Sequence, residues 1–401
     1  MKKFKTLALA TASIFTACGL ASCNPSAEFA PVEKENVKIG LICLHDESST
    51  YDKNFIEGMN RAVADLGLNS NQVLLATGID ETAACKDKAV EFASKGCQAI
   101  FADSFGHEDY MIQAAQEFPN VRFAHATGTK AHTVKMDNYS NAFASIYEGR
   151  YLAGVAAGMK LQEMKTAGKL KGTAPKLGYV GAFPYEEVKS GYTAFYLGAK
   201  SIVEDVTMEV RFTGSWYDPV GEKNTATALI NAGADIISQH ADSMGAPEAC
   251  ETAKVPNVTY NGSTASACPD TYLVSSKINW TPYFKYMINQ VIKGERLVTD
   301  YTGSIADGSV ELDAVGTCAA AGTQDKINDI KSKLLDGSLH VFDTSKFTVG
   351  GKKVESHKSN VDFDDAYTPD TEVIADGYFH ESEYRSAPYF DLDIDGITIV
   401  E

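Results

Sequence analysis

Short apolar segments suited to buried strands alternate along this chain with segments of helical spacing, and this alternation constrains its fold more than any other feature. The series begins with an expected strand at 37–44 and an expected helix at 54–66. It continues with expected strands at 72–76, 99–102 and 121–125 and expected helices at 81–93 and 109–117. Strands that alternate with helices over short connections form a parallel sheet covered on both faces.

The pattern restarts after an expected long helix at 142–164. The second series has strands at 176–180, 208–212, 235–239 and 257–261, with helices at 186–203, 222–231 and 246–254. The sequence therefore predicts an α/β protein with two successive doubly wound units, each of about a hundred residues.

The composition is that of a globular protein with an acidic surface. Of the 401 residues, 44% are hydrophobic and 22% are charged, and the formal net charge is −17. Removal of residues 1–22, which hold three lysines and no acidic residue, would make it −20. Such a surface repels nucleic acids and anionic lipid headgroups, so no nucleic-acid partner is expected.

The N-terminus has the order of a secretory signal peptide. Lys2, Lys3 and Lys5 precede an apolar run that ends near Leu20, and this run is too short to span a membrane. The following Cys23 completes a Leu-x-x-Cys ending that resembles the bacterial lipobox. The resemblance implies cleavage before Cys23 and attachment of lipid, including palmitate, to this cysteine. The protein would then be tethered to the outer side of the cell membrane. The alternative is an ordinary signal peptide with an incidental cysteine.

Residues 24–36 are polar, carry two prolines and are interpreted as a flexible tether that reaches on the order of 20 Å. Six further cysteines follow: Cys43, Cys85, Cys97, Cys250, Cys268 and Cys318. Their pairing is left open, because six cysteines allow 15 connectivities. None of them has zinc-site spacing with a second cysteine or a histidine, and no metal or cofactor is expected.

The residues that follow each expected strand are rich in aromatic and short polar side chains. Ligands of open α/β sheets bind beyond the carboxyl ends of the strands, and two facing sheets form a cleft that can close. The segments in question are 45–46, 103–105, 182–183, 214–216 and 240–243. This mixture suits a flat small molecule with polar edges.

Five stretches occur in the same order as in a known family, over a resemblance that runs from about residue 37 to the C-terminus. They are 104–106 (SFG), 147–154 (YEGRYLAG), 178–184 (GYVGAFP), 216–219 (WYDP) and 239–243 (QHADS). In these stretches the chain resembles the basic membrane protein family of ABC-transporter substrate-binding lipoproteins, which includes purine-nucleoside receptors. The glycines of 147–154 are interpreted as helix-packing residues rather than as a binding site.

The resemblance implies a type I periplasmic-binding fold, with two parallel-sheet lobes joined by three crossovers. The expected parts are a signal peptide (1–22), a lipidated tether (23–36), an N-terminal lobe (37–141 with 262–298) and a C-terminal lobe (142–261 with 299–401). The implied partners are a purine base or nucleoside, an ABC permease, and the bilayer through Cys23.

The resemblance also implies one stacking residue. In the nucleoside receptors an aromatic residue lies seven positions before a helix glycine and is followed by Asn, and counting back from Gly58 places Tyr51 and Asp52 there. Asp in place of Asn is a departure from the family that changes the polar contacts. A loop tyrosine without a ligand is the alternative.

The remaining candidates follow strands of the two units, and most of them have a structural alternative. Trp216 is expected to stack on the ligand, and a place in the core is the alternative. Asp218 is a candidate ligand contact, but the sequence slightly favours a role as the cap of a helix that begins with Pro219. The other candidates are Ser104, Phe105, Phe183, His240 and Asp242. For Phe183 the alternative is packing at the start of a helix, and for His240 and Asp242 it is a role in local structure.

An extracellular nucleoside hydrolase is the competing class of function, and binding of another small solute such as a pentose is a further alternative. A hydrolase would gather several aspartates at one strand end, whereas the carboxylates here are scattered. The chain also lacks the Gly-x-Ser-x-Gly, HExxH, GxGxxG and Walker A motifs. The sequence therefore predicts a binding protein rather than an enzyme.

Overall fold

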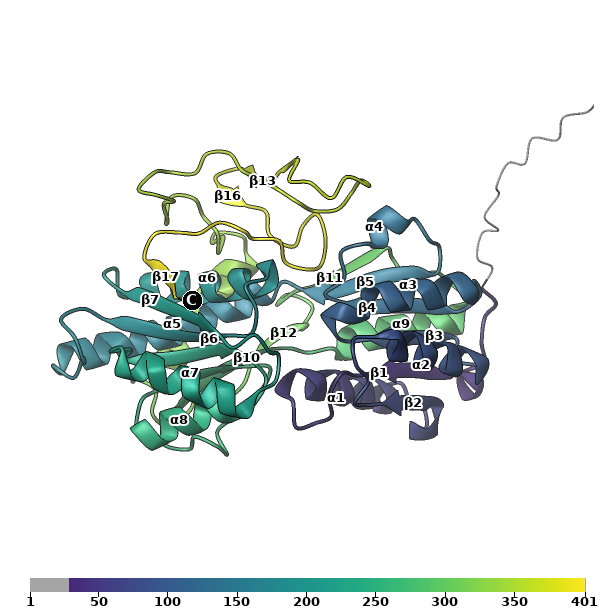
Figure 1. Cartoon of the computed structure of the whole chain (residues 1–401), viewed down its shortest axis with the longest axis horizontal. Helices are drawn as coiled ribbons and strands as arrows, with labels where there is room; N and C mark the ends of the chain where they lie inside the picture. The colour runs from purple at the N-terminus through teal and green to yellow at the C-terminus, as the bar shows by residue number, and fades with distance from the viewer. Residues whose placement is uncertain (1–28, 401) are drawn as a thin grey trace, which may run out of the picture.

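The two series of strands build two separate sheets that lie side by side (Figure 1) in the computed structural model, which describes residues 29–400. The signal peptide, Cys23 and most of the tether lie outside the described residues. No helix within 29–400 combines the length and the apolar character that a membrane crossing requires. The six cysteines of this part are unpaired.

The first lobe is a six-stranded parallel sheet in the order β11-β5-β4-β3-β1-β2. Its strands are β1 (Ile39–Ile42), β2 (Val73–Ala76), β3 (Ala99–Ala102), β4 (Arg122–Ala126), β5 (Tyr139–Ala144) and β11 (Asp300–Gly303). Its helices are α1 (Thr50–Asp65), α2 (Ala83–Ser94), α3 (Glu108–Glu117), α4 (Ala131–Val134) and α9 (Thr281–Lys293).

The second lobe is a seven-stranded sheet in the order β12-β10-β9-β8-β6-β7-β17, in which only β12 is antiparallel to its neighbour among the described strands. Its strands are β6 (Lys176–Gly181), β7 (Thr207–Phe212), β8 (Ile236–His240), β9 (Asn257–Tyr260), β10 (Tyr272–Ile278), β12 (Val310–Leu312) and β17 (Ile397–Val400). Its helices are α5 (Ile146–Thr166), α6 (Glu186–Lys200), α7 (Pro219–Asn231), α8 (Gly245–Ala253) and α10 (Thr323–Leu335).

The chain passes between the lobes three times, as the resemblance to the type I periplasmic-binding fold implies, but the passages differ from the expected boundaries. Strand β10, expected in the first lobe within 262–298, pairs with β9 of the second. Strand β11, expected in the second lobe, pairs with β5 of the first. Polar Ser275, Ser276 and Lys277 interrupt β10, so it lacks the continuous apolar run that marks a buried strand.

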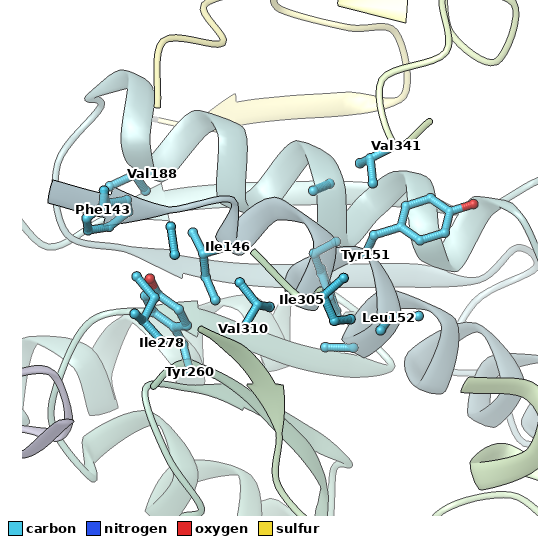
Figure 2. Packing of buried hydrophobic residues seen from close by; sticks show 14 of the residues in the cluster. Phe143, Ile146, Tyr151, Leu152, Val188, Tyr260, Ile278, Ile305, Val310 and Val341 are labelled. Carbon is cyan, nitrogen blue, oxygen red and sulfur yellow. The ribbon is translucent and has the colours of Figure 1, made fainter. Parts of the chain in front are cut away.

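Helix α5 begins later than expected, because 139–144 is a fully buried strand whose apolar character merges with that of the helix. Glycines let α5 and α6 approach closely: a Cβ on Gly154 would lie 2.0 Å from the Phe195 carbonyl oxygen, and a Cβ on Gly198 2.1 Å from that of Tyr151. This supports the helix-packing interpretation of 147–154. Figure 2 shows α5 side chains such as Leu152 among the buried residues of the second lobe.

A C-terminal segment (336–396) leaves α10 and crosses above both lobes before β17 joins the second sheet (Figure 1). It contains the short strands β13 (Lys358–Ser359), β14 (Thr371–Glu372), β15 (Ile374–Ala375) and β16 (Tyr378–Phe379). Asp362 of this segment is buried, and its carboxylate lies 3.1 Å from the guanidinium of Arg385.

Candidate functional site

A cavity lies between the lobes at the carboxyl ends of their strands. The first lobe contributes residues that follow β1, β3 and β4, and the second contributes residues that follow β7 and β8 and the start of α6. The lining residues are Leu44, His45, Tyr51, Asp52, Ser104, Phe105, Thr127, Glu187, Trp216, His240 and Asp242. This is the position at which open α/β sheets bind small molecules.

The lobes touch each other around this cavity. The backbone N–H of Thr50 donates to the Asp242 carbonyl oxygen at 3.0 Å, and Asn54 Nδ2 donates to Asn261 Oδ1 at 3.4 Å. The rings of His45 and Tyr217 also approach across the cleft, with centroids 5.4 Å apart. The structure therefore shows the lobes in a closed arrangement.

Tyr51 lies in the first turn of α1 and lines the cavity. Its hydroxyl donates to the Asp103 carbonyl oxygen at 2.8 Å, and its ring meets Phe55 edge-on at 4.9 Å. Burial and the charge of Glu187 raise the pKa of Tyr51 well above its usual range, so the side chain stays neutral. Tyr51 thus presents an aromatic ring held in one orientation.

Asp52 also lines the cavity, but local hydrogen bonds occupy its carboxylate. Oδ1 accepts from the His45 backbone N–H at 2.8 Å, and Oδ2 accepts from the hydroxyl of Ser49, the N-cap residue of α1, at 2.6 Å. Burial opposes ionisation of Asp52, but the hydrogen bonds from His45 and Ser49 outweigh it and lower the pKa. Asp52 is therefore a charged residue that orders the loop after β1.

Behind Asp52, a cluster of Cys43, Asp52 and Asp103 brings three potential ligand atoms within 4.8 Å of one another. Burial raises the pKa of both Cys43 and Asp103 well above their usual ranges, and the Asp52 carboxylate adds to the effect on each. A thiol and a carboxyl that keep their protons donate hydrogen bonds and do not ligate a cation well. The cluster fits a shared-proton network under Tyr51 better than a metal centre.

Ser104 and Phe105 follow β3 at the cavity. The Ser104 hydroxyl donates to Glu81 Oε1 at 2.6 Å, and its carbonyl oxygen accepts from His125 Nε2 at 2.6 Å. Phe105 is 41% exposed and stacks on Tyr185 of the other lobe at 5.1 Å. Ser104 is held by its own lobe, while Phe105 faces across the cleft.

Aromatic residues of the second lobe extend this stack toward Trp216. Tyr185 stacks on Phe183 at 5.2 Å, and Phe183 meets Trp216 edge-on at 5.0 Å. Trp216 lines the cavity, whereas Phe183 is not among the lining residues and instead supports Trp216 and Tyr185. The alternative of local packing thus fits Phe183.

Asp218 is not among the lining residues of the cavity. Its Oδ1 accepts hydrogen bonds from the backbone N–H groups of Val220 at 3.2 Å and Gly221 at 2.9 Å, and α7 begins at Pro219. Asp218 is therefore the N-cap of α7, as the capping alternative has it.

His240 and Asp242 lie at the end of β8 and line the cavity. Burial lowers the pKa of His240, whose Nε2 lies 3.4 Å from Glu187 Oε1. Burial and the nearby Asp52 raise the pKa of Asp242 well above its usual range, while Asn261 Nδ2 donates to Oδ1 at 3.5 Å. A neutral imidazole and a protonated carboxyl each offer one donor and one acceptor, the complement of a polar ligand edge.

Three residues that shape the site were not among the sequence candidates. Glu187 lies in the first turn of α6, just after the 178–184 stretch, so a search for first-turn acids beside the cleft could have found it. Thr127 follows β4 with φ of +61°, a strained value for a β-branched residue that is typical of functional sites. The third is Glu222, which does not line the cavity but holds two of its loops through hydrogen bonds.

Glu222 is a fully buried residue of α7 that joins two loops of the site. Its Oε1 accepts from the Asp218 backbone N–H at 3.2 Å, and its Oε2 accepts from the Ser243 backbone N–H at 3.2 Å. These two loops carry Trp216 and Asp242. Nothing in the sequence near Glu222 separates it from an ordinary helix-surface glutamate.

Comparison with known families gives a match over most of the chain. A family model described as ABC transporter substrate-binding protein PnrA-like, named Bmp, matches residues 39–344. A purine-binding protein of Brucella abortus is 29% identical over 340 residues, which cover 80% of this chain and 89% of that protein.

Two further relatives match over a shorter range. A putative ABC transporter glucose-binding protein of Haloferax volcanii is 31% identical over 257 residues, and an ABC transporter nucleoside-binding protein of Lactococcus lactis is 24% identical over 243 residues. These alignments cover 64% and 59% of this chain, and 62% and 64% of those proteins, which is less than two thirds of each relative's length.

Solved structures agree on the fold. A solute-binding protein of an ABC transporter system from Aeropyrum pernix superposes with a TM-score of 0.64 at 16% identity, covering 76% of this chain and 93% of that structure. One from Conexibacter woesei has a TM-score of 0.59 at 20% identity, covering 76% and 98%. At such identities these likenesses establish the periplasmic-binding-protein fold and nothing finer.

Proposed function

The chain belongs to the Bmp family of PnrA-like ABC transporter substrate-binding proteins, and we propose that it captures a purine base or nucleoside in the cavity between its lobes. The observation that carries the proposal is that one cavity is lined by Tyr51 from the first lobe and Trp216 from the second. The names of the Brucella and Lactococcus relatives, purine-binding and nucleoside-binding, agree with it.

In this proposal Tyr51 and Trp216 stack on the faces of the base, which contributes about 1–3 kcal/mol per stacked base in proteins that use such contacts. The neutral His240 and Asp242, with Glu187, recognise its polar edge. Since these residues come from both lobes, the ligand stabilises the closed arrangement by its contacts with both. Asp52 and Ser104 hold the loops that present the aromatic residues.

A sugar is the second candidate ligand, because the Haloferax relative carries the name of a glucose-binding protein. Carboxylates beside aromatic rings also suit hydroxyl-rich ligands, and Glu187, Asp52 and Trp216 line the cavity. Binding of glucose and pentoses, compared with binding of purines, distinguishes the two candidate ligands.

The proposal includes delivery of the bound solute without turnover. Residues 20–23 predict a lipoprotein anchored through Cys23, with the lobes on the outer side of the cell membrane and an ABC permease as partner. Mass spectrometry of the membrane-extracted protein is expected to show diacylglycerol on an N-terminal Cys23. An unmodified protein released from the membrane would contradict the anchor and leave the binding proposal standing.

Replacement of Trp216 tests the stacking proposal. We expect Trp216→Ala to weaken purine binding by about 1–3 kcal/mol, which is roughly five- to 150-fold in Kd, and Trp216→Phe to retain most of the affinity. The measurement is isothermal titration calorimetry with adenosine and guanosine. An unchanged affinity in Trp216→Ala would refute the stacking role.

A further inference from the structure

The C-terminal segment is held by the second lobe at both of its ends. It follows α10, and it leads into β17, which pairs with β7 of the second sheet. Most of the segment lies beyond residue 344, where the match to the family model ends. Figure 1 shows that it crosses above both lobes between these two ends. A segment that is fixed to one lobe therefore also reaches the other.

Further contacts join the body of the segment to the second lobe. The ring of Phe342 lies 5.3 Å from that of Tyr147 in α5 and stacks on Phe390 of the segment at 4.4 Å. In α6, Lys189 donates from Nζ to the Asp391 carbonyl oxygen at 3.1 Å. These contacts fix the body of the segment to the second lobe.

Residues 362–364 of the segment contact the first lobe, and we call them the clasp. They meet α4, a short helix between β4 and β5 of the first lobe. Thr133 of α4 donates from Oγ1 to the Asp362 carbonyl oxygen at 2.7 Å. The ring of His132, also in α4, meets that of Phe363 edge-on at 4.6 Å. The clasp thus joins a segment of the second lobe to a helix of the first.

A buried arginine holds the clasp against the body of the segment. Arg385 donates from Nη1 to Asp362 Oδ2 and to the Asn360 carbonyl oxygen, both at 3.1 Å. The same guanidinium donates from Nη2 to the Pro388 carbonyl oxygen at 3.0 Å. Because hydrogen bonds from a charged group are strong, the clasp keeps its place on the segment when α4 moves.

Opening of the cleft moves the two lobes apart about the crossovers that join them. The clasp belongs to one moving body and α4 to the other. Opening would therefore break the hydrogen bond from Thr133 and separate His132 from Phe363.

We propose that the clasp restrains opening of the lobes, because its contacts with α4 form in the closed arrangement and are lost in the open one. The C-terminal segment then sets how often the cleft opens, whichever solute the cavity binds. This role is independent of the proposed function, since it concerns the movement of the lobes rather than the ligand.

The backbone N–H of Thr50 reports opening directly. It donates across the cleft to the Asp242 carbonyl oxygen at 3.0 Å, and as the first residue of α1 it has no acceptor within its own helix. Its exchange with solvent deuterium therefore measures the population of open molecules. The backbone N–H of Asp242 donates to the Trp216 carbonyl oxygen of the same lobe at 3.0 Å and is the internal control.

Deuterium exchange of the chain from Asn24, measured by nuclear magnetic resonance without ligand, compares the wild type with Thr133→Val/Phe363→Ala. The double variant removes the hydroxyl donor of Thr133 and the ring of Phe363, which is 39% exposed. We expect exchange at Thr50 to be about tenfold faster, because a lost hydrogen bond and a lost aromatic contact each shift the equilibrium several-fold. Exchange at Asp242 is expected to stay the same.

A second double variant, Thr252→Val/Leu335→Ala, is the matched control. It removes a hydroxyl and an apolar side chain at exposed positions away from the clasp, and the Thr252 hydroxyl donates within its own helix to the Glu248 carbonyl oxygen at 2.8 Å. We expect it to leave exchange at Thr50 unchanged. An unchanged rate at Thr50 in the clasp variant, or an equal increase in both variants, would overturn the inference.

Phe363→Ala alone provides the same test if the double variant does not fold. It changes a half-exposed side chain, and exchange at Thr50 is expected to be about threefold faster. The wild-type rate in this variant would contradict the restraint. Thermal unfolding without ligand verifies that each variant is folded.

Discussion

Glu222 offers a test of how the structure holds the site loops. Burial raises the pKa of this carboxyl to about 7, despite the hydrogen bonds it accepts from Ser243 and Asp218. In the unfolded chain a glutamate has a pKa of about 4.3. The folded protein therefore keeps a proton that the unfolded chain has lost, and its stability falls as the pH rises from about 4.3 to 7 and then levels off.

The size of the effect follows from the two pKa values. Between pH 6 and pH 8, the folded protein loses most of this proton while the unfolded chain changes little, which corresponds to about 1 kcal/mol of lost unfolding free energy. Oε1 of Glu222 lies within hydrogen-bond distance of both backbone N–H groups, at 3.2 Å from that of Asp218 and 3.3 Å from that of Ser243. Glu222→Gln keeps an acceptor oxygen at this position and cannot ionise. We expect its stability relative to the wild type to rise by about 1 kcal/mol over this interval.

Urea unfolding of both proteins at pH 6 and pH 8 measures the difference. Glu248→Gln, an exposed glutamate paired with Lys223 at 3.2 Å, is the matched control and is expected to keep the wild-type slope. Comparison with the wild type is needed because burial also raises the pKa of Glu148 to about 7 and of Glu381 to about 8. If Glu222→Gln retained the full wild-type slope, the reasoning about this carboxyl would be refuted.

Two further predictions concern stability. Gly198→Ala would place a Cβ against the Tyr151 carbonyl oxygen and is expected to lower the free energy of unfolding by about 1–3 kcal/mol or more. Gly172→Ala, whose Cβ would have its nearest contact at 3.7 Å, is the control and is expected to lower it by less than about 1 kcal/mol. Thermal unfolding compares the two variants, and equal losses would contradict the close contact between α5 and α6. The six described cysteines are unpaired, so a reductant is expected to leave the unfolding temperature unchanged. A thiol reagent is expected to react with all six after denaturation without reductant. A smaller number of reactive thiols would reveal a disulfide.

The sequence predicts the two parallel sheets because their strands are short, apolar and separated by helical spacing. It places the lobe boundaries less well, since Ser275–Lys277 disguise β10 and the apolar β5 runs into α5. Pairing between distant segments, such as β11 with β5 and β17 with β7, depends on tertiary contacts that no local pattern records.

Much of the candidate site could be predicted for the same reason. Tyr51, Asp52, Ser104, Phe105, Trp216, His240 and Asp242 all follow strands or begin a helix at the cleft, and all line the cavity. Phe183 and Asp218 have structural roles instead: Phe183 packs against Trp216, and Asp218 caps α7. Their positions directly before Pro184 and Pro219 fit these roles as well as they fit ligand binding. Glu222 could not be predicted, because its role depends on two loops that only the folded protein brings together.

The proposed capture of a purine is tested most directly by thermal unfolding of the chain from Asn24 with a panel of nucleobases, nucleosides, glucose and pentoses. A ligand at a hundred times its Kd adds about 2.7 kcal/mol to the unfolding free energy. The account predicts a saturable rise in unfolding temperature with purine compounds and none with the sugars. A rise with a sugar and none with any purine would keep the fold and the family and contradict the proposed ligand.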